Sequence, residues 1–126
     1  MKILVTGSAG FIGSAVSIKL LERGDEVIGI DNHNNYYDPE LKEARLARHY
    51  NHPKYTHIRM SIEDRDEIDK LFIDHQFEGV INLAAQAGVR YSIENPLTYI
   101  GTNLVGFAHI LEGCRHNNVR HLVYAS

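Results

Sequence analysis

Short runs of apolar and β-branched residues recur along the whole chain, and longer stretches of mixed polarity separate them. Runs of this kind, bounded by polar or turn-forming residues, are typical of strands buried in a sheet. They predict five strands, over residues 2–6, 26–31, 55–60, 79–84 and 121–125. Because most runs are apolar at successive positions, we expect both faces of the sheet to be covered.

The stretches between the predicted strands carry apolar residues at helical spacing. They predict helices over residues 11–23, 39–49, 64–75 and 96–117. The first should end at Gly24, because glycine readily takes the left-handed conformation found just past a helix. The last has the clearest stripe, with spacings of three and four residues between Leu97, Ile100, Leu104, Phe107, Leu111 and Cys114.

Strands that alternate with helices indicate an α/β fold, here a Rossmann-type doubly wound parallel sheet. With 126 residues the chain fits a single domain, residues 1–126. Its fifth predicted strand ends at the last residues, with no helix after it. We therefore expect the chain to be the N-terminal part of a longer protein, cut after the fifth strand.

The composition is that of an ordinary globular protein, with 44% hydrophobic residues, 23% charged residues and a net charge of -3. This balance argues against nucleic acid or an anionic membrane as the partner. Residues 3–18 are uncharged, but glycine and hydroxyl residues interrupt them, so no signal peptide is expected. The one cysteine, Cys114, fits a reducing compartment, and we expect a cytoplasmic protein.

Three glycines, Gly7, Gly10 and Gly13, follow the first predicted strand in the stretch TGSAGFIG and open the first predicted helix. Gly7 permits the tight turn, Gly10 lets backbone amides approach a pyrophosphate, and Gly13 lets the helix lie close to the strand. The positive end of the helix beginning near Phe11 would then face the phosphates. The pattern predicts a dinucleotide site; the alternative is a glycine-rich turn without a ligand.

Asp31 strengthens the prediction because it ends the second predicted strand, 18 residues after Gly13. An acidic residue about 20 residues on binds the adenosine ribose in such sites. Its charge would repel a 2′-phosphate, and no arginine stands beside it in the sequence, so NAD is favoured over NADP. Arg45 and Arg48 keep NADP open, and a strand-end aspartate that merely caps a turn is the structural alternative.

TGSAGFIG together with Asp31 resembles the extended short-chain dehydrogenase/reductase family, whose fingerprint is TGxxGFIG. DNHNNYYD, residues 31–38, resembles the ribose loop of that family, and NLAAQAGVRYSIENP, residues 82–96, its segment under the cofactor. The resemblance implies NAD as cofactor. It implies a cofactor site made of Gly7, Gly10, Phe11, Ile12, Gly13, Asp31, Asn32, His33, Asn35, Ile62, Leu83, Ala84, Ala85, Gln86 and Thr102.

Within that family, residues 31–38 and 84–96 look most like UDP-glucuronate 4-epimerases. The resemblance implies a nucleotide-sugar substrate, UDP-glucuronate, converted to UDP-galacturonate by transient oxidation at C4, with NAD as a prosthetic group. It also implies a homodimer formed through the helix over 96–117. Other sugar-nucleotide epimerases, dehydratases or decarboxylases, and a non-catalytic dinucleotide-binding module, remain alternatives.

The chain departs from the family pattern at two positions, Ser61 where aspartate is common and Gly101 where a polar residue is usual. The Tyr-x-x-x-Lys pair that carries the chemistry in the family is expected to be absent, so we assign no catalytic residue and expect the chain alone to be inactive. His49 and His52 have a metal-ligand spacing but no convincing third ligand, so no metal site is predicted.

Overall fold

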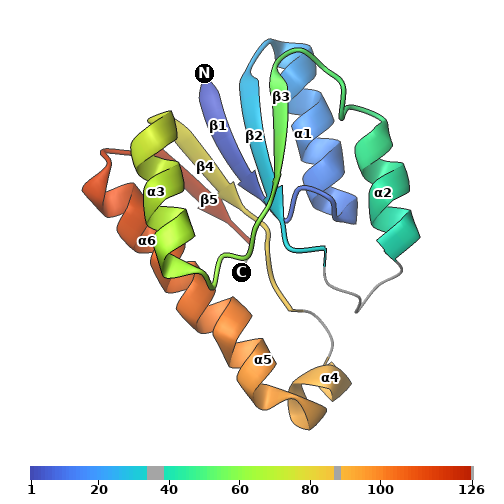
Figure 1. Cartoon of the computed structure of the whole chain (residues 1–126), viewed down its shortest axis with the longest axis vertical. Helices are drawn as coiled ribbons and strands as arrows, with labels where there is room; N and C mark the ends of the chain where they lie inside the picture. Colours follow the sequence, from blue (N-terminus) through green and yellow to red (C-terminus); the bar gives the residue numbers. More distant parts are fainter. Residues whose placement is uncertain (34–38, 87–88, 126) are drawn as a thin grey trace.

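A computed structural model describes residues 1–33, 39–86 and 89–125 of the chain. Its centre is a sheet of five parallel strands in the order β3-β2-β1-β4-β5 (Figure 1). The strands are β1 (Lys2–Thr6), β2 (Glu26–Asp31), β3 (Tyr55–Arg59), β4 (Gly79–Asn82) and β5 (His121–Tyr124). The Rossmann-type sheet predicted from the sequence is thus confirmed, with β3, β4 and β5 one or two residues shorter than expected.

Helices cover both faces of the sheet (Figure 1). On one face lie α1 (Phe11–Arg23) and α2 (Pro39–Ala47), and on the other α3 (Arg65–His75) and α6 (Phe107–His116). Gly24 ends α1 in the left-handed conformation, with φ 98°, as predicted. The helix predicted over 39–49 stops at Ala47, two residues early.

The long helix predicted over 96–117 is present, but its middle is wound differently. It runs as α5 (Pro96–Ile100), a π-helical segment η1 (Gly101–Gly106) and α6, and a short helix α4 (Val89–Glu94) that was not predicted precedes it. Gly106 lies against Ile62, and a Cβ at this position would come within 2.5 Å of the Ile62 side chain. The spacing of apolar residues in the sequence does not reveal such close packing. π-helical segments often lie at functional sites.

Two apolar clusters, one on each face, hold the sheet between the helices. β1 contributes to both, because Leu4 packs toward α3 and α6 while Ile3 and Val5 pack toward α1 and α2. This is the alternation expected of a strand buried on both sides. The central strand that ends at the glycine loop is therefore fixed on both faces.

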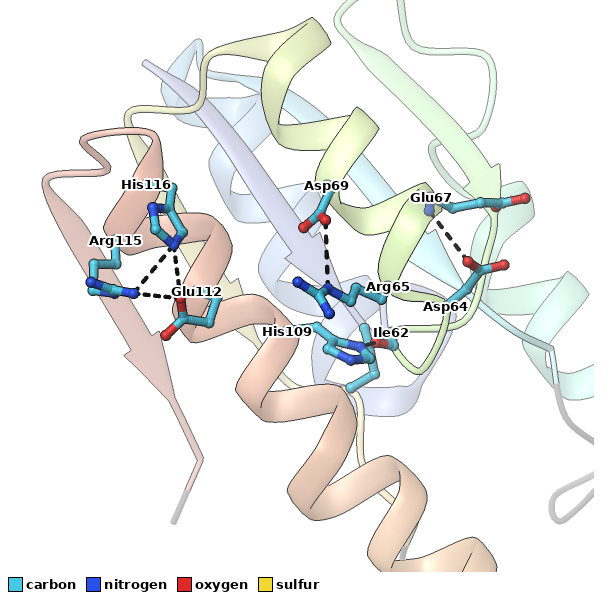
Figure 2. A network of polar contacts seen from close by, with 9 residues as sticks. All are labelled: Ile62, Asp64, Arg65, Glu67, Asp69, His109, Glu112, Arg115 and His116. Carbon is cyan, nitrogen blue, oxygen red and sulfur yellow. Dashed lines mark hydrogen bonds and ion pairs between the residues drawn. The ribbon is translucent and has the colours of Figure 1, made fainter.

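Figure 2 shows the polar contacts that join α6 to the segment after β3. His109 of α6 donates through Nδ1 to the carbonyl oxygen of Ile62, at 2.8 Å. Asp64 accepts the Glu67 N–H at 3.3 Å and caps the start of α3. The exposed pairs Arg65–Asp69 and Arg115–Glu112 contribute little stability, as surface ion pairs do. The His109 contact matters more, because it fixes the backbone beside the pocket described next.

The order of the strands determines where a ligand-binding pocket lies in this fold. β1 lies between β2 and β4, so the connections leave it in opposite directions, toward β3 on one side and β5 on the other. In open parallel sheets ligands bind at this reversal, outside the carboxyl ends of the strands. The helices α4 and α5 project beyond that edge of the sheet (Figure 1).

Candidate dinucleotide-binding site

A pocket of about 440 Å³ opens at the carboxyl ends of β1, β2 and β4. All the residues predicted for the cofactor site line it, except His33 and Asn35. Asn35 lies outside the described residues, and His33 is described but does not line the pocket. The lining also includes Ile30, Lys42, Met60 and Ala125, which the sequence did not single out. It further includes Arg45 and Ser61, which the sequence raised only as a reason to keep NADP open and as a departure from the family pattern.

The glycine loop has the close packing that its spacing predicts. Gly7 adopts φ 70°, and a Cβ there would lie 2.9 Å from the backbone nitrogen of Ala84. A Cβ at Gly13 would overlap the carbonyl oxygen of Gly7, whereas one at Gly10 would meet only that oxygen, at 3.2 Å. Gly7 and Gly13 are therefore required by the fold, while a methyl group at Gly10 would need the Gly7 carbonyl to move by only a few tenths of an ångström.

The N-terminus of α1 opens onto the pocket. Its first turn contains no acidic residue, and no side chain in the described part of the protein caps it. The N–H of Ser14 bonds to the carbonyl of Gly10 at 3.0 Å, and Gly10, Phe11, Ile12 and Gly13 all line the pocket. Unpaired N–H groups and the positive end of the helix dipole together make an anion site.

The hydroxyl of Thr6, which the sequence did not single out for this site, holds the opposite wall. It donates to Oδ1 of Asn82 at 2.5 Å and accepts the N–H groups of Leu83 at 3.1 Å and Ala84 at 3.0 Å. This hydroxyl joins the end of β1 to the end of β4 through buried hydrogen bonds. The small residues predicted to lie under a cofactor are therefore held in place from the neighbouring strand.

Asp31 is buried, 5% exposed, and its carboxylate accepts three hydrogen bonds. Oδ2 accepts the Ala9 N–H at 3.1 Å, and Oδ1 accepts the His33 N–H at 2.8 Å and the Lys42 ammonium at 2.9 Å. The sequence argument treated this charge as uncompensated. The structure corrects that, because Lys42 of α2 neutralises it inside the pocket.

His33 supports the site indirectly, by linking Asp31 to β3. Its Nε2 lies 2.8 Å from Nε2 of His57, whose Nδ1 lies 2.9 Å from the Tyr55 hydroxyl. Burial lowers the pKa of His57 to about 4 and raises the pKa of Tyr55 to about 12, so both are neutral at pH 7. This neutral chain links β3 to the residue whose N–H holds Asp31, so His33 acts through Asp31 and lines no part of the pocket.

The two departures from the family pattern, Ser61 and Gly101, both lie close to Glu63, whose N–H donates to the Ser61 hydroxyl at 3.2 Å. Thr102 donates to Oε1 of Glu63 at 2.5 Å, and a Cβ at Gly101 would lie 3.1 Å from Oε2 of the same carboxylate. Asn103 holds the backbone of Gln86 through two hydrogen bonds of 2.8 and 2.9 Å. Gly101 thus leaves room for Glu63, a carboxylate two residues from Ser61.

The expectation that the sequence lacks the Tyr-x-x-x-Lys pattern is wrong as a statement about spacing, because Tyr50 and Lys54 have it. The structure places this pair at the amino ends of the strands, where Lys54 donates from Nζ to the Gly24 carbonyl at 3.1 Å. Tyr50 is 53% exposed, and neither residue lines the pocket. The pair is therefore remote from the candidate site.

The described residues hold no group of three or more histidine, cysteine, aspartate or glutamate side chains that could bind a metal ion. His49, one of the two histidines weighed for that role, is buried against Tyr55 with ring centroids 4.5 Å apart. Among the same residues, no helix has the length and apolar character needed to cross a membrane.

A parallel sheet with a glycine-rich turn, an uncapped helix start and a buried strand-end aspartate defines a Rossmann-type dinucleotide-binding fold. The sequence profile of one family, described as GDP-mannose 4,6 dehydratase, matches residues 4–126. The chain belongs to this family. The resemblance stated from TGSAGFIG and Asp31 is thereby confirmed.

Known relatives include nucleotide-sugar epimerases. The chain is 54% identical over 126 residues to Protein CapI of Staphylococcus aureus, covering 100% of this chain and 37% of that protein. It is 47% identical over 116 residues to UDP-glucuronate 4-epimerase 3 of Arabidopsis thaliana, covering 92% of this chain and 27% of that protein. The chain thus spans 37% of the length of the first of these relatives and 27% of the length of the second.

Among solved structures, the UDP-glucuronic acid 4-epimerase from Bacillus cereus, in complex with UDP-glucuronic acid and NAD, superimposes with a TM-score of 0.87. That match has 33% sequence identity and covers 98% of this chain and 39% of the Bacillus chain. The fold, including the strand order that positions the pocket, is therefore shared with a nucleotide-sugar epimerase.

Proposed function

We propose that residues 1–126 are the NAD-binding part of a nucleotide-sugar 4-epimerase that interconverts UDP-glucuronate and UDP-galacturonate. The observation that carries this proposal is the pocket itself, which joins the uncapped start of α1, the buried carboxylate of Asp31 and the small residues after β4. The relatives named UDP-glucuronate 4-epimerase support the substrate.

The residues present fit NAD. The close-packed glycines leave the amides of the α1 N-terminus open to a pyrophosphate, and Asp31 stands where an adenosine ribose would lie. Ile30, Met60 and Ile62 give the same end of the pocket apolar walls that suit an adenine ring. When bound, NAD supplies reversible hydride acceptance from the sugar carbon.

The contribution of residues 1–126 would be to bind and orient the cofactor. Thr6 holds the backbone of Leu83 and Ala84, and Asn103 holds that of Gln86, so the floor under a cofactor is rigid. We assign no catalytic residue to residues 1–126 and propose that the acid-base pair and the substrate domain belong to a longer protein. The length of the relatives supports this division.

Activity tests the substrate assignment. The full-length protein that contains this sequence should convert UDP-glucuronate to UDP-galacturonate without net consumption of NAD, and residues 1–126 alone should not. The products are separated by chromatography. Formation of a dehydrated or decarboxylated nucleotide sugar would assign the protein as a dehydratase or a decarboxylase instead. NAD binding without turnover of any nucleotide sugar would favour a non-catalytic module.

We also propose a homodimer that forms through the helix over 96–117, supported by its exposed apolar side chains. Leu97 is 83% exposed and Leu104 66%, and Ile93 of the neighbouring α4 is 76% exposed. Apolar residues gathered at one place on a surface are typical of interaction sites.

Residues 1–126 should therefore self-associate as their concentration rises, and changing both Leu97 and Leu104 to serine should shift the chain toward monomer. Light scattering over a concentration series measures this. As a control, Ile73→Ser on α3 removes a residue about as exposed as Leu104, 64% against 66%, outside the proposed interface. A chain that stays monomeric at every concentration would exclude the interface.

Cys114, the one cysteine of the chain, is relevant to the cellular compartment in which the protein works. Burial raises the pKa of Cys114 to about 11, so its thiol stays protonated at pH 7. An unreactive, half-buried thiol is compatible with our proposal that the protein works in the cytoplasm.

A further inference from the structure

His33 is held at two points, and both affect the Asp31 carboxylate. Its backbone has φ 54°, in the left-handed region that residues other than glycine seldom adopt. Its N–H donates to Oδ1 of Asp31 at 2.8 Å, and its ring Nε2 lies 2.8 Å from Nε2 of His57. A backbone conformation of this kind persists only where neighbouring contacts hold it. The contact with His57 therefore helps to fix the direction in which the His33 N–H points.

His57 is itself held by Tyr55, which precedes it by two residues on β3 and so lies on the same face of the sheet. The Tyr55 hydroxyl lies over Gly29 of β2, where a Cβ would lie 2.2 Å from the hydroxyl oxygen. Because that space is free, the hydroxyl reaches Nδ1 of His57 at 2.9 Å. The His57 ring is therefore held at Nδ1 as well as at Nε2.

Both histidine rings are neutral at pH 7. Burial lowers the pKa of His33 below its ordinary value. Within the described ranges, charged side chains act on that pKa in both directions, Asp31 and Glu43 raising it and Arg59 and Lys42 lowering it. The pKa of His57, about 4, has the same main cause, burial. Each ring therefore carries a single hydrogen on nitrogen, at Nδ1 or at Nε2.

The Tyr55 hydroxyl determines which nitrogen of each ring carries that hydrogen. A phenol is a better donor than acceptor, whereas an imidazole nitrogen without hydrogen is a good acceptor. Tyr55 therefore donates to Nδ1 of His57, which leaves the His57 hydrogen on Nε2. That nitrogen then donates to Nε2 of His33, whose own hydrogen is on Nδ1. The hydrogen bonds thus run in one direction, from Tyr55 through His57 to His33.

We propose that Tyr55 and His57 are positioning residues of the nucleotide site, which hold the ring of His33 and, through its N–H, the Asp31 carboxylate. The proposal rests on the proposed function, since it takes Asp31 as the group that binds the ribose. Neither Tyr55 nor His57 lines the pocket, so both act through His33. A carboxylate that is already fixed loses less conformational freedom when a ligand binds. NAD affinity should therefore depend on two side chains that NAD would not touch.

Calorimetric titration with NAD tests this proposal. His57→Leu should weaken NAD binding about fivefold, and Tyr55→Phe about threefold. His57→Gln should stay within about twofold of the wild type, because its side-chain amide can donate to His33 from the position of Nε2. His75→Leu is the matched control, since His75 is a half-buried histidine that stacks on Phe77 outside the pocket, and this variant should keep wild-type affinity.

A double-mutant cycle separates positioning from a general loss of stability. In a chain that carries Asp31→Ala and Lys42→Met, adding His57→Leu should weaken NAD binding no further, because no carboxylate is left to position. An equal loss in both backgrounds, or wild-type affinity in His57→Leu alone, would overturn the proposal and leave NAD binding intact. Failure of the wild-type chain to bind NAD would overturn the proposed function as well.

Nitrogen magnetic resonance of the histidine rings at pH 7 is a second measurement, which needs no nucleotide and decides the matter if His57→Leu fails to fold. We expect hydrogen on Nε2 of His57 and on Nδ1 of His33 in the wild type. Tyr55→Phe should give a mixture of both ring forms of His57, because the donor to Nδ1 is lost. Hydrogen on Nδ1 of His57 in the wild type would overturn the proposal.

Discussion

Changing Gly13 to alanine should destabilise the fold by more than about 3 kcal/mol, because the new methyl group overlaps backbone atoms that cannot move independently. The carbonyl of Gly7 and the Cα of Ser8 border that position, and both belong to a loop fixed between β1 and α1. Urea denaturation measures the loss as a lower midpoint at unchanged slope.

Gly10→Ala is the matched comparison. Gly10 has an extended backbone, φ -76° and ψ 175°, and a methyl group there meets only the Gly7 carbonyl, at 3.2 Å. This variant should lose much less stability than Gly13→Ala and bind NAD at least about tenfold more weakly, since the methyl group enters the pocket beside the α1 N-terminus. Wild-type stability in Gly13→Ala would show that the loop is not packed as described.

Asp31→Ala should lower both stability and NAD affinity. Removing the carboxylate leaves the Lys42 ammonium buried without its partner, which costs about 3 kcal/mol or more. It also frees the N–H groups of Ala9 and His33 and removes the group proposed to bind the ribose, so NAD affinity should fall by at least about tenfold. Calorimetry and urea denaturation separate the two effects.

The double variant Asp31→Ala with Lys42→Met provides the control. Removing both charges should recover much of the lost stability, because an apolar pair can replace a buried ion pair. NAD affinity should stay low, since the ribose contact is still missing. Equal NAD affinity in the wild type and in Asp31→Ala would remove Asp31 from the site.

The sequence predicted the sheet and the glycine loop because both depend on local patterns. The alternation of apolar runs with helical spacing predicted the strands, and Gly7, Gly10 and Gly13 meet steric requirements that the loop itself imposes. Asp31 could be predicted for the same reason, since the end of a strand is recognisable from the sequence alone. These residues could be assigned before any tertiary contact was known.

The rest of the site depends on how separate elements meet. Lys42 and Arg45 reach the pocket only because α2 packs beside α1, and nothing in their spacing indicates that arrangement. The same holds for Thr6, whose role requires β4 to pair with β1. Tyr50 and Lys54 show the reverse case, a catalytic spacing that the fold places at the wrong end of the sheet.

A nuclear magnetic resonance titration of the labelled chain with NAD tests the central claim most directly. The amide signals of Gly7, Gly10 and Gly13, and those of Leu83 to Gln86, should shift saturably, while those of Tyr50 and Lys54 at the other end of the sheet should not. Saturable shifts confined to the pocket are the result we predict. No saturable shift, or shifts centred away from the glycine loop, would contradict the assignment of this pocket to NAD.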